Sequence, residues 1–464
     1  MAVDPVTLLR ANGPLPASRL AERMGASRAT LSRAVRQAAG ALIVRGQARR
    51  TTYAARRALR GSLDPLPLFR IDSTGTPHHI ADLDLVYPDG TAVNFIGDFG
   101  WPLDDRMRDG WFDGLPYPMQ DMRPQGFLGR NFARHHAAML QVKDDPTTWS
   151  DDDVLYALSI LGQDVPGDLL IGAQACRLWL SHVQETTSVG APGGVLDSQI
   201  ANEYPRRATY MMVMGFLGSS VGGEFPKFPV LRHFADNTQQ HMLVKFSGSD
   251  DSPGTRRWAD LLVCEHLAGR ALRDTTGIEC AKSEIHVHAG RTFLEVERFD
   301  RHGALGRSPM VSWFALDAAF VGDAGRPWAE AVRPLVLRGW LSADEVDRIL
   351  RTWLFGQLIG NTDMHDGNLS LIPVTDGSGT AFTIAPIYDM LPMMYAPVRG
   401  VELPPRSYVP RLPLPAERAA WQEAADAALV FWSMAAIDDR ISAEFRQTCA
   451  ANEALLGKLV QRSA

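Results

Sequence analysis

Residues 360 to 371 read GNTDMHDGNLSL, a polar, turn-forming segment that leads directly into an apolar stretch. Within this segment Asp363 precedes Asn368 by five positions, and Asp389 follows Asn368 by twenty-one. The residues between Asn368 and Asp389 show two short strand patterns, at 368–372 and 382–387, separated by turn residues. Because a hairpin returns the chain to its starting point, we expect Asp389 to lie beside Asn368 in the folded protein.

This spacing is typical of the catalytic loop of a phosphotransferase. In such loops the aspartate accepts the proton of the attacking hydroxyl group and the asparagine holds a magnesium ion. Asn368 and Asp389 offer two oxygen ligands that suit octahedral Mg²⁺ bridging phosphate oxygens. We therefore expect Asp363 to be a catalytic base and the other two residues to bind magnesium. The plainer alternative is that all three only form turns, because Asn-Thr-Asp and Asp-Gly-Asn are common turn sequences.

A glycine-rich segment further upstream, SSVGGEFPK at 219–227, is a candidate phosphate-binding loop. Gly222 and Gly223 allow backbone N–H groups to approach phosphates closely, and Lys227 adds positive charge. The segment lacks the spacing of a Walker A loop. Lys245 follows within a predicted apolar strand, where a lysine normally needs a partner or a ligand.

The length of 464 residues is too great for one hydrophobic core and predicts two or three domains. We place them at 1–60, 61–205 and 206–464. No apolar run reaches the length of a membrane span, and the N-terminus has no signal-peptide pattern. The four cysteines are scattered, which indicates neither a disulfide framework nor a zinc site. We therefore expect a cytoplasmic protein with an α+β fold.

Several secondary-structure elements can be predicted from periodicity and turn signals. They are a strand pair at 80–95, a helix at 151–162 capped by Ser150, a strand at 241–246, a helix at 258–272, a hairpin turning at Ala289-Gly290, helices at 311–321 and 343–360, and a helical tail at 416–462. Asp151, Asp152 and Asp153 fall in the first turn of one predicted helix. We interpret them as solvated acids that the helix dipole favours, not as a metal site.

The charge of the chain is unevenly distributed. Residues 1–60 contain twelve arginines, no lysine, one aspartate and one glutamate, a net charge of +10. Because the whole chain carries −6, the remainder carries −16. A basic module attached to an acidic body commonly binds a polyanion.

The basic module has the pattern of two short helices separated by a tight turn. A predicted first helix ends at Gly25-Ala26, and Ser27 can cap a second helix. Leu31 and Val35 are spaced so that both face the first helix. The opposite face of the second helix is polar and basic, as a recognition helix in a DNA major groove requires. Its residues are Arg28, Thr30, Arg33 and Arg36.

A hairpin is predicted next, at 42–53, with Arg49 and Arg50 at its tip, where they are placed to contact DNA phosphates. The segment 17–38 resembles the winged helix-turn-helix of bacterial regulators, so we expect residues 1–60 to bind DNA. The alternatives are RNA binding and a small helical domain that mediates only dimerisation, with its arginines on a solvated face.

The order of residues in the 360–371 segment resembles one family in particular. His365 lies two positions after Asp363, in a D-x-H-x-x-N order, whereas ordinary protein kinases place the histidine before the aspartate. This order is similar to that of HipA toxins and of the phosphatidylinositol-kinase-like branch. The SSVGGEFPK segment resembles the phosphate-binding loop of HipA proteins, and LEVERFDR at 294–301 resembles the segment that joins their two lobes. The resemblance covers roughly residues 206–400, with the blocks in the family's order.

The resemblance implies roles for individual residues. Asp363 matches the catalytic base, and Asn368 and Asp389 match the magnesium ligands. Lys245 matches the lysine that pairs with nucleotide phosphates, and Ser220 matches a loop serine that such kinases autophosphorylate. The other ATP-binding residues that it implies are Gly222, Gly223, Lys227, His365, Tyr388 and, holding adenine through backbone groups, Glu297, Arg298 and Phe299.

The family resemblance also implies a bilobal, protein-kinase-like (HipA-like) body, ATP and Mg²⁺ as cofactors, and transfer to a serine or threonine hydroxyl. An aminoacyl-tRNA synthetase is the target class that it suggests, with a HipB-like antitoxin as a further expected partner. A homodimer is also expected, since symmetric reading of an operator usually requires a dimer. HipA toxins usually rely on a separate helix-turn-helix antitoxin, whereas here such a module is fused at the N-terminus. In this respect the chain looks most like the YjjJ-type HipA-like proteins.

Two other functions remain compatible with the sequence. One is a DNA-binding transcriptional regulator whose kinase-like body senses nucleotide without turnover. The other is a kinase for a small molecule such as a sugar or a lipid head group. The sequence also leaves open which acid pairs with Lys245, since Asp260 and Glu265 both lie on the helix predicted at 258–272.

Overall fold

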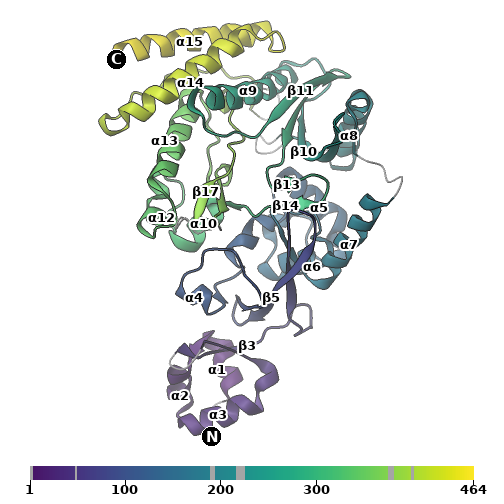
Figure 1. The fold of residues 1–464 in the computed structure, drawn as a ribbon, viewed down its shortest axis with the longest axis vertical. Coiled ribbons are helices and arrows are strands. Elements are labelled where there is room, and N and C mark those ends of the chain that lie inside the picture. Colours follow the sequence, from purple (N-terminus) through teal and green to yellow (C-terminus); the bar gives the residue numbers. More distant parts are fainter. Residues whose placement is uncertain are drawn as a thin grey trace. The chain divides into compact units, whose positions relative to one another are not determined.

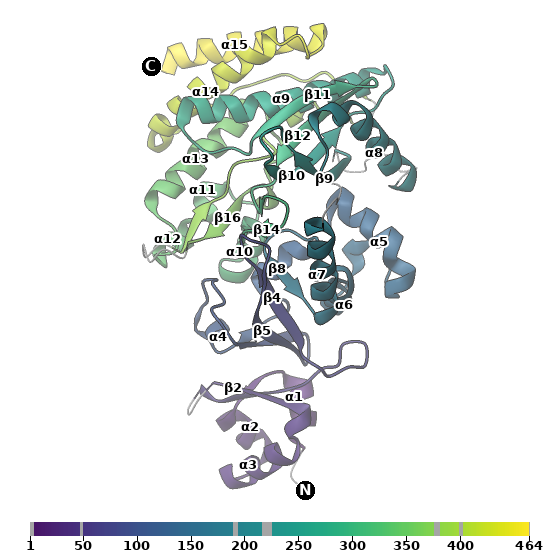
Figure 2. The same cartoon turned by 45° about the vertical axis from the view of Figure 1, so that its right-hand side comes forward.

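The computed structural model describes residues 4–46, 50–188, 194–215, 225–374, 381–398 and 402–463. They fall into two compact units, which appear in Figures 1 and 2. Unit 1 comprises Met1–Arg123 and His136–Glu185, and unit 2 comprises Pro124–His135 and Thr186–Ala464. Each unit contains helices and sheets, so the expected mixture of α and β structure is confirmed.

Unit 1 begins with three helices and a small sheet of order β1-β3-β2. Their bounds are α1 (Pro5–Asn12), β1 (Leu15–Pro16), α2 (Ala17–Met24), α3 (Arg28–Gln37), β2 (Leu42–Arg45) and β3 (Thr52–Ala55). The predicted break between two helices is confirmed. Gly25 adopts the left-handed conformation after α2, and the Ser27 hydroxyl accepts the Thr30 N–H at the start of α3. Leu20 and Leu31 pack into one buried cluster between these helices.

The remainder of unit 1 is built on a five-stranded sheet of order β7-β6-β5-β4-β8. The strands are β4 (Leu66–Ile71), β5 (Pro77–Val86), β6 (Gly90–Phe95), β7 (Trp111–Phe112) and β8 (Leu169–Ile171). The helices of this part of unit 1 include α4 (Asp105–Arg108), α6 (Asp151–Leu161) and α7 (Ala173–Thr187). Helix α5 (Gly126–Leu140) belongs to unit 2 as far as His135 and to unit 1 from His136. The strand pair predicted at 80–95 is confirmed by the antiparallel β5 and β6. Helix α6 begins as predicted, with Ser150 and Asp153 in a reciprocal capping box.

The interpretation of the acids at the start of α6 as merely solvated is wrong. Each forms an ion pair with an arginine: Asp151 with Arg123, Asp152 with Arg57, and Asp153 with Arg60. Arg57 and Arg60 come from the basic N-terminal module. Some arginines of that module therefore bind it to the rest of unit 1. The net charge of the module does not reveal this role.

Unit 2 contains a four-stranded antiparallel sheet of order β11-β12-β10-β9. The strands are β9 (Lys227–His233), β10 (Gln239–Phe246), β11 (Ser283–His288) and β12 (Arg291–Glu297), and helices α8 (Ile200–Gly215) and α9 (Pro253–Thr276) flank them (Figure 1). Neighbouring residues of a strand point to opposite faces of the sheet. Val244 and Phe246 accordingly share a buried cluster with Tyr204 of α8, whereas Lys245 between them points toward α9.

The predictions for this sheet and its helix are confirmed. The strand predicted at 241–246 lies within β10, and the helix predicted at 258–272 lies within α9. The hairpin turns at Ala289 and Gly290, with φ angles of 49° and 72°. Two positive φ angles at the centre of a two-residue turn match the twist of the adjoining strands.

The rest of unit 2 combines short strands with a group of helices. Strands β13 (Arg301–His302) and β14 (Gly306–Arg307) pair with each other, and β15 (Val311–Ser312), β16 (Ser370–Pro373) and β17 (Phe382–Ile384) form a three-stranded sheet. The helices are α10 (Trp313–Phe320), α11 (Trp328–Ala331), α12 (Arg333–Leu337), α13 (Ala343–Leu358), α14 (Arg418–Ile437) and α15 (Ala443–Ser463). A short 3₁₀ helix, η6 (Asp366–Asn368), precedes β16.

The predicted helical tail is helical but interrupted. It consists of α14 and α15, which are separated by a turn at residues 438–442. The two helices pack against each other, and α14 packs against α9 and α13 (Figure 1). Within the described ranges, none of the helices combines the length and the apolar character needed to cross a lipid bilayer.

Candidate active site

The buried side chain of Lys245 lies at the centre of the candidate site. It projects from β10 toward α9, and the residue is only 5% exposed. Its Nζ donates to both carboxylate oxygens of Glu265, at 2.6 and 2.8 Å, and also to the carboxylate of Asp389. The partner of Lys245 on α9 is therefore Glu265. The other candidate, Asp260, instead accepts the N–H and the hydroxyl group of Ser442, each at 2.7 Å, ahead of α15.

The charges of this cluster stabilise one another. Burial alone lowers the pKa of Lys245, but the carboxylates of Asp389 and Glu265 outweigh it and raise that pKa above its usual value. Burial raises the pKa of Glu265. Burial also acts against ionisation of Asp389, but the Lys245 ammonium outweighs it and holds the pKa of Asp389 below its usual range. Lys227 contributes further positive charge, since β9 pairs it directly opposite Lys245.

Asp389 has an unusual backbone conformation. Its φ angle is +56°, in the left-handed region that residues other than glycine rarely adopt. Asn361 helps to hold this conformation, because its Nδ2 donates to the Asp389 carbonyl at 3.2 Å. The side chain of Asp389 is 33% exposed, whereas those of Lys245 and Glu265 are 6% and 7% exposed. Asp389 is therefore the most accessible member of the cluster.

The loop that begins at Asn361 is held by its own amide groups. Asn361 Oδ1 accepts the Asp363 N–H at 3.0 Å, and Asn368 Nδ2 donates to the Asp363 carbonyl at 2.7 Å. His365 Nδ1 accepts the Gly367 N–H at 3.1 Å and so caps η6. The prediction that Asn368 begins a strand is wrong, because its amide closes the loop and leaves it in the 3₁₀ turn. With the backbone fixed in this way, Asp363 is exposed and Asn368 is buried.

Tyr388 joins this loop to the strand that leads to Asp389. Its hydroxyl group donates to the Gly367 carbonyl at 2.8 Å and lies 2.8 Å from the Ser370 hydroxyl group. Its ring stacks on Phe299, with centroids 5.9 Å apart and planes inclined by 28°. Two residues that we predicted to contact the nucleotide are thus in contact with each other.

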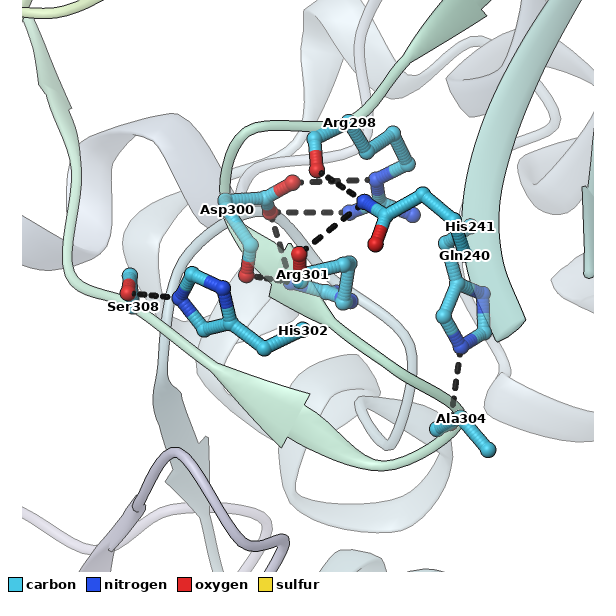
Figure 3. A network of polar contacts seen from close by, with 8 residues as sticks. All are labelled: Gln240, His241, Arg298, Asp300, Arg301, His302, Ala304 and Ser308. Atoms are coloured by element: carbon cyan, nitrogen blue, oxygen red, sulfur yellow. Dashed lines mark hydrogen bonds and ion pairs between the residues drawn. The ribbon is translucent and has the colours of Figure 1, made fainter. Parts of the chain in front are cut away.

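The connection that follows β12 is held by the polar network in Figure 3. The guanidinium group of Arg298 donates to Asp300 at 3.1 and 2.9 Å, and Arg301 donates to Asp300 at 2.6 Å. Gln240 Nε2 donates to the carbonyls of Arg298 and Arg301, both at 3.0 Å. His241 contacts the carbonyl of Ala304 at 2.8 Å. This network fixes the connection against β10.

Hydrogen bonds within the same connection limit how its backbone could bind the adenine base of a nucleotide. The N–H of Glu297 donates to the Lys282 carbonyl at 2.8 Å, and that of Arg298 donates to the His241 carbonyl at 3.0 Å. These two N–H groups are therefore engaged within the protein. Backbone recognition of adenine by this segment would fall to carbonyl oxygens and to Phe299.

Several predicted residues lie outside the described residues: Ser220, Gly222, Gly223 and Arg49. Lys227, which ends the same glycine-rich segment, begins β9.

The predicted DNA-binding residues lie at the surface of unit 1. Arg28, Arg33 and Arg36 are exposed on α3, and none of them pairs with an acid in the part of the chain that the structure describes. Thr30 is half-buried, and its hydroxyl group contacts that of Ser27 at 3.0 Å, so it belongs to the helix cap. Arg50 is 71% exposed and lies 3.9 Å from the Asp109 carboxylate.

Other arginines of the basic module are committed to its attachment. Arg45 and Arg56 both donate to Asp84, at 3.4 and 2.5 Å, and Asp84 is only 5% exposed. Arg45 and Arg56, like the arginines paired at the start of α6, therefore bind acids elsewhere in unit 1. The arginines on α3 are exposed.

The donor set at the loop suits magnesium. Asn368 directs its Nδ2 to the Asp363 carbonyl, so its Oδ1 points away from that carbonyl, and Asp389 contributes a partly exposed carboxylate. One amide oxygen and one carboxylate oxygen are hard ligands of the kind that Mg²⁺ uses alongside phosphate and water. Across the described ranges, no group of three or more His, Cys, Asp and Glu side chains is arranged to hold a metal. Magnesium held here would therefore depend on nucleotide oxygens as well.

Asn361 is the residue of this site that sequence reasoning missed. It bonds to the backbones of both Asp363 and Asp389, whereas the sequence indicates only that it belongs to a turn. A signal was present, since an asparagine two positions before an aspartate can accept the N–H of that residue. Its second bond, to a residue 28 positions away, has no local signal.

Comparisons with known proteins identify the family to which the chain is similar. The family model described as "YjjJ-like toxin, middle domain" matches residues 62–180, and that described as "HipA-like C-terminal domain" matches residues 219–454. The chain is 36% identical over 442 residues to Toxin YjjJ of Escherichia coli (strain K12), which covers 95% of this chain and 94% of that protein.

Among solved structures, the HipA toxin of Shewanella oneidensis MR-1, determined in complex with HipB and operator DNA, matches with a TM-score of 0.53 and 17% identity. The match covers 86% of this chain and 97% of that chain, and it shows a shared fold. A proinflammatory kinase of Helicobacter pylori, CtkA, matches with a TM-score of 0.35 and 10% identity, over 52% of this chain and 94% of that chain.

Proposed function

Because the chain belongs to the HipA family of toxins, in the YjjJ-like branch that 95% of its length matches, we propose that it is an ATP- and magnesium-dependent serine/threonine protein kinase. The observation that carries the proposal is the buried Lys245, bonded to both Glu265 and Asp389. Burying a lysine is costly unless its charge has partners or a ligand. A role in binding phosphate explains why a buried lysine lies at this position, bonded to Asp389.

The proposed roles follow from the position of each side chain. Lys245 would bind nucleotide phosphates, with its ammonium oriented by Glu265. Asn368 and Asp389 would hold magnesium through the two oxygens described above. Bound magnesium would neutralise charge that develops on the phosphate oxygens. Because Asp389 already pairs with Lys245, the two residues can exchange this contact for contacts to a nucleotide without leaving a charge unpaired.

Asp363 is the proposed catalytic base. Its carboxylate is exposed, while its backbone N–H and carbonyl are fixed by Asn361 and Asn368. A base held in this way can accept the proton of a serine or threonine hydroxyl group as the oxygen attacks the terminal phosphate. The segment Glu297 to Phe299 would bind adenine, and Ser220 is the candidate site of autophosphorylation.

Incubation of the protein with γ-labelled ATP and Mg²⁺, followed by mapping of the phosphorylated residues, tests this proposal. We expect label on the wild type and a loss of about 10²-fold or more in Asp363→Ala. Asp366→Asn, which changes a neighbouring acid of the same loop, is the matched control and should retain activity. Full activity of Asp363→Ala would refute the assignment. Bound nucleotide without transfer would favour a nucleotide-sensing regulator, and transfer only to an added small molecule would favour a small-molecule kinase.

Residues 1–60 form, in our proposal, a winged helix-turn-helix domain that binds DNA, followed by domains at 61–205 and 206–464. The exposed Arg28, Arg33 and Arg36 on α3 support this proposal, since none is committed to an ion pair within the described residues. The S. oneidensis relative was solved with HipB and operator DNA. A HipB-like antitoxin, an aminoacyl-tRNA synthetase as substrate and a homodimer are further candidate partners.

A further inference from the structure

A cavity of about 400 Å³ lies beside the second half of α9, apart from the nucleotide site proposed above. One wall is formed by Gly269, Arg270 and Arg273 of α9, and the other by the segment that leads into β11, including Lys282 and Ser283. Figures 1 and 2 show α9 and β11 side by side in both views. The size falls within the range of small-molecule sites.

The cavity is positively charged. Arg270, Arg273 and Lys282 line it, and Glu279 is the acid among its lining residues. Arg270 has no acidic partner in the part of the chain that the structure describes. The other two cations form long ion pairs, from Arg273 to Asp274 at 3.3 Å and from Lys282 to Glu297 at 3.7 Å, and in each pair at least one partner is exposed. Such pairs contribute little and yield readily to a more highly charged ligand.

Polar groups complete the lining. His266 Nδ1 lies 3.0 Å from the Ser283 hydroxyl group. Burial, and after it the positive charges of Arg440 and Arg270, lower the pKa of His266 to about 4. The ring is therefore neutral at neutral pH, where an imidazole and a hydroxyl group can both hydrogen-bond to an anion. Asp438, which pairs with Arg440 at 2.6 Å, opposes this shift.

We propose that this cavity binds a small phosphorylated anion. Convergent guanidinium and ammonium groups with a hydroxyl group between them recognise phosphate oxygens through charge-assisted hydrogen bonds. Gly269 is part of the cavity wall, and a Cβ there would make ordinary contact with the Cβ of Cys280, at 3.7 Å. A bulky side chain at this position is therefore expected to reduce the space for the anion.

The walls of the cavity are bonded to the kinase-like site. Ile387, which lies two residues before Asp389, forms two of these hydrogen bonds. Its carbonyl accepts the Ala281 N–H at 2.9 Å, and its N–H donates to the Glu279 carbonyl at 2.9 Å. The Lys282 carbonyl accepts the N–H of Glu297, in the proposed adenine segment. On the helix wall, His266 directly follows Glu265. An anion that draws the two walls together thus acts on three elements of the proposed site and changes its activity.

Titration of the full-length protein with inorganic pyrophosphate, followed by calorimetry, tests the binding. We expect binding to the wild type to weaken by about tenfold or more in Arg270→Ser, which removes a charge-assisted contact, and likewise in Gly269→Val, which places a bulky side chain at the cavity wall. Arg256→Ser, which changes an exposed arginine on the same helix, is the control and should bind as the wild type does. Absence of binding to the wild type would overturn the proposal, as would loss of binding in Lys227→Ala but not in Arg270→Ser. Binding of a phosphoserine peptide without binding of pyrophosphate would also overturn it.

The proposal that the bound anion changes the rate of phosphate transfer rests on the proposed kinase activity. The proposal that the cavity binds the anion does not. The rate of phosphate transfer should change severalfold with pyrophosphate in the wild type and not in Arg270→Ser. The same response in both proteins would refute the regulation. A wild type that binds pyrophosphate in the cavity but transfers no phosphate would count against the proposed function and leave the site intact.

Discussion

The side-chain amide of Asn361 donates to the main-chain carbonyl of Asp389 at 3.2 Å. The oxygen of the same amide accepts the N–H of Asp363 at 3.0 Å, so one buried side chain joins the proposed base to the proposed metal ligand. Asp389 adopts a left-handed backbone, which costs a non-glycine residue roughly 1–2 kcal/mol. The bond from Asn361 is one of the interactions that offset this cost.

Replacement of Asn361 by alanine should therefore impair magnesium use more than folding. Loss of the amide leaves the Asp389 carbonyl and the Asp363 N–H without their partner, at a cost of about 1–3 kcal/mol. With Asp389 less firmly placed, the magnesium concentration that gives half of the maximal rate should rise severalfold. A magnesium titration of the transfer rate measures this, with Thr362→Ala, an exposed neighbour, as control. An unchanged magnesium requirement in Asn361→Ala would show that the residue is only structural.

The ion pair between Lys245 and Glu265 should show strong coupling in stability. Lys245→Met leaves Glu265 buried without its counter-charge, and breaking a buried pair in this way costs about 3–5 kcal/mol. Replacement of both residues by methionine removes the unpaired charge, so the double variant should be more stable than Lys245→Met alone. Urea unfolding of the four proteins measures the coupling. Simple additivity of the two single effects would contradict the pairing, and neither single nor double variant should transfer phosphate.

His266 should make the protein less stable as the pH falls below neutrality. Its pKa is about 4 in the folded protein, because of burial and of Arg440 and Arg270, against about 6.5 when unfolded. The unfolded chain therefore binds the proton more readily, and the stabilisation is fully present above pH 6.5 and is lost as the pH falls toward 4. Between pH 7 and pH 5 we expect a loss of roughly 1–2 kcal/mol, after allowance for solvent screening. Urea unfolding at the two pH values should show a smaller difference in His266→Asn than in the wild type. Equal pH dependence in both proteins would contradict the prediction.

The two sets of arginines in the basic module should differ in their effect on DNA binding. Arg33 is exposed on α3, whereas Arg60 is paired with Asp153 at 2.7 Å. If α3 contacts phosphates, Arg33→Ala should weaken binding and reduce the slope of log affinity against log salt by about 1. Arg60→Ala should leave that slope unchanged. Affinity measurements on duplex DNA at several salt concentrations test this, and a wild-type affinity that does not respond to salt would refute binding through phosphates.

Much of the local structure could be predicted from the sequence because short-range chemistry determines it. Ser27 and Ser150 cap helices where their hydroxyl groups meet the next turn, and Ala289-Gly290 forms the tight turn that its neighbours require. The return of the chain to Asp389 followed from two strands and a turn in succession. These features depend on residues within one element or one hairpin, so their signals are present in the sequence itself.

Only the tertiary structure decided which groups meet across elements. Asp260 and Glu265 lie five positions apart on α9 and so point to different faces of the helix. The packing of α9 against β10 on one side, and the approach of Ser442 ahead of α15 on the other, determined which of them pairs with Lys245. The arginines of the basic module divided in the same way, since the acids that neutralise some of them come from distant segments of unit 1. Composition determines how many charges a chain carries, but the partner of each depends on long-range packing that no local pattern encodes.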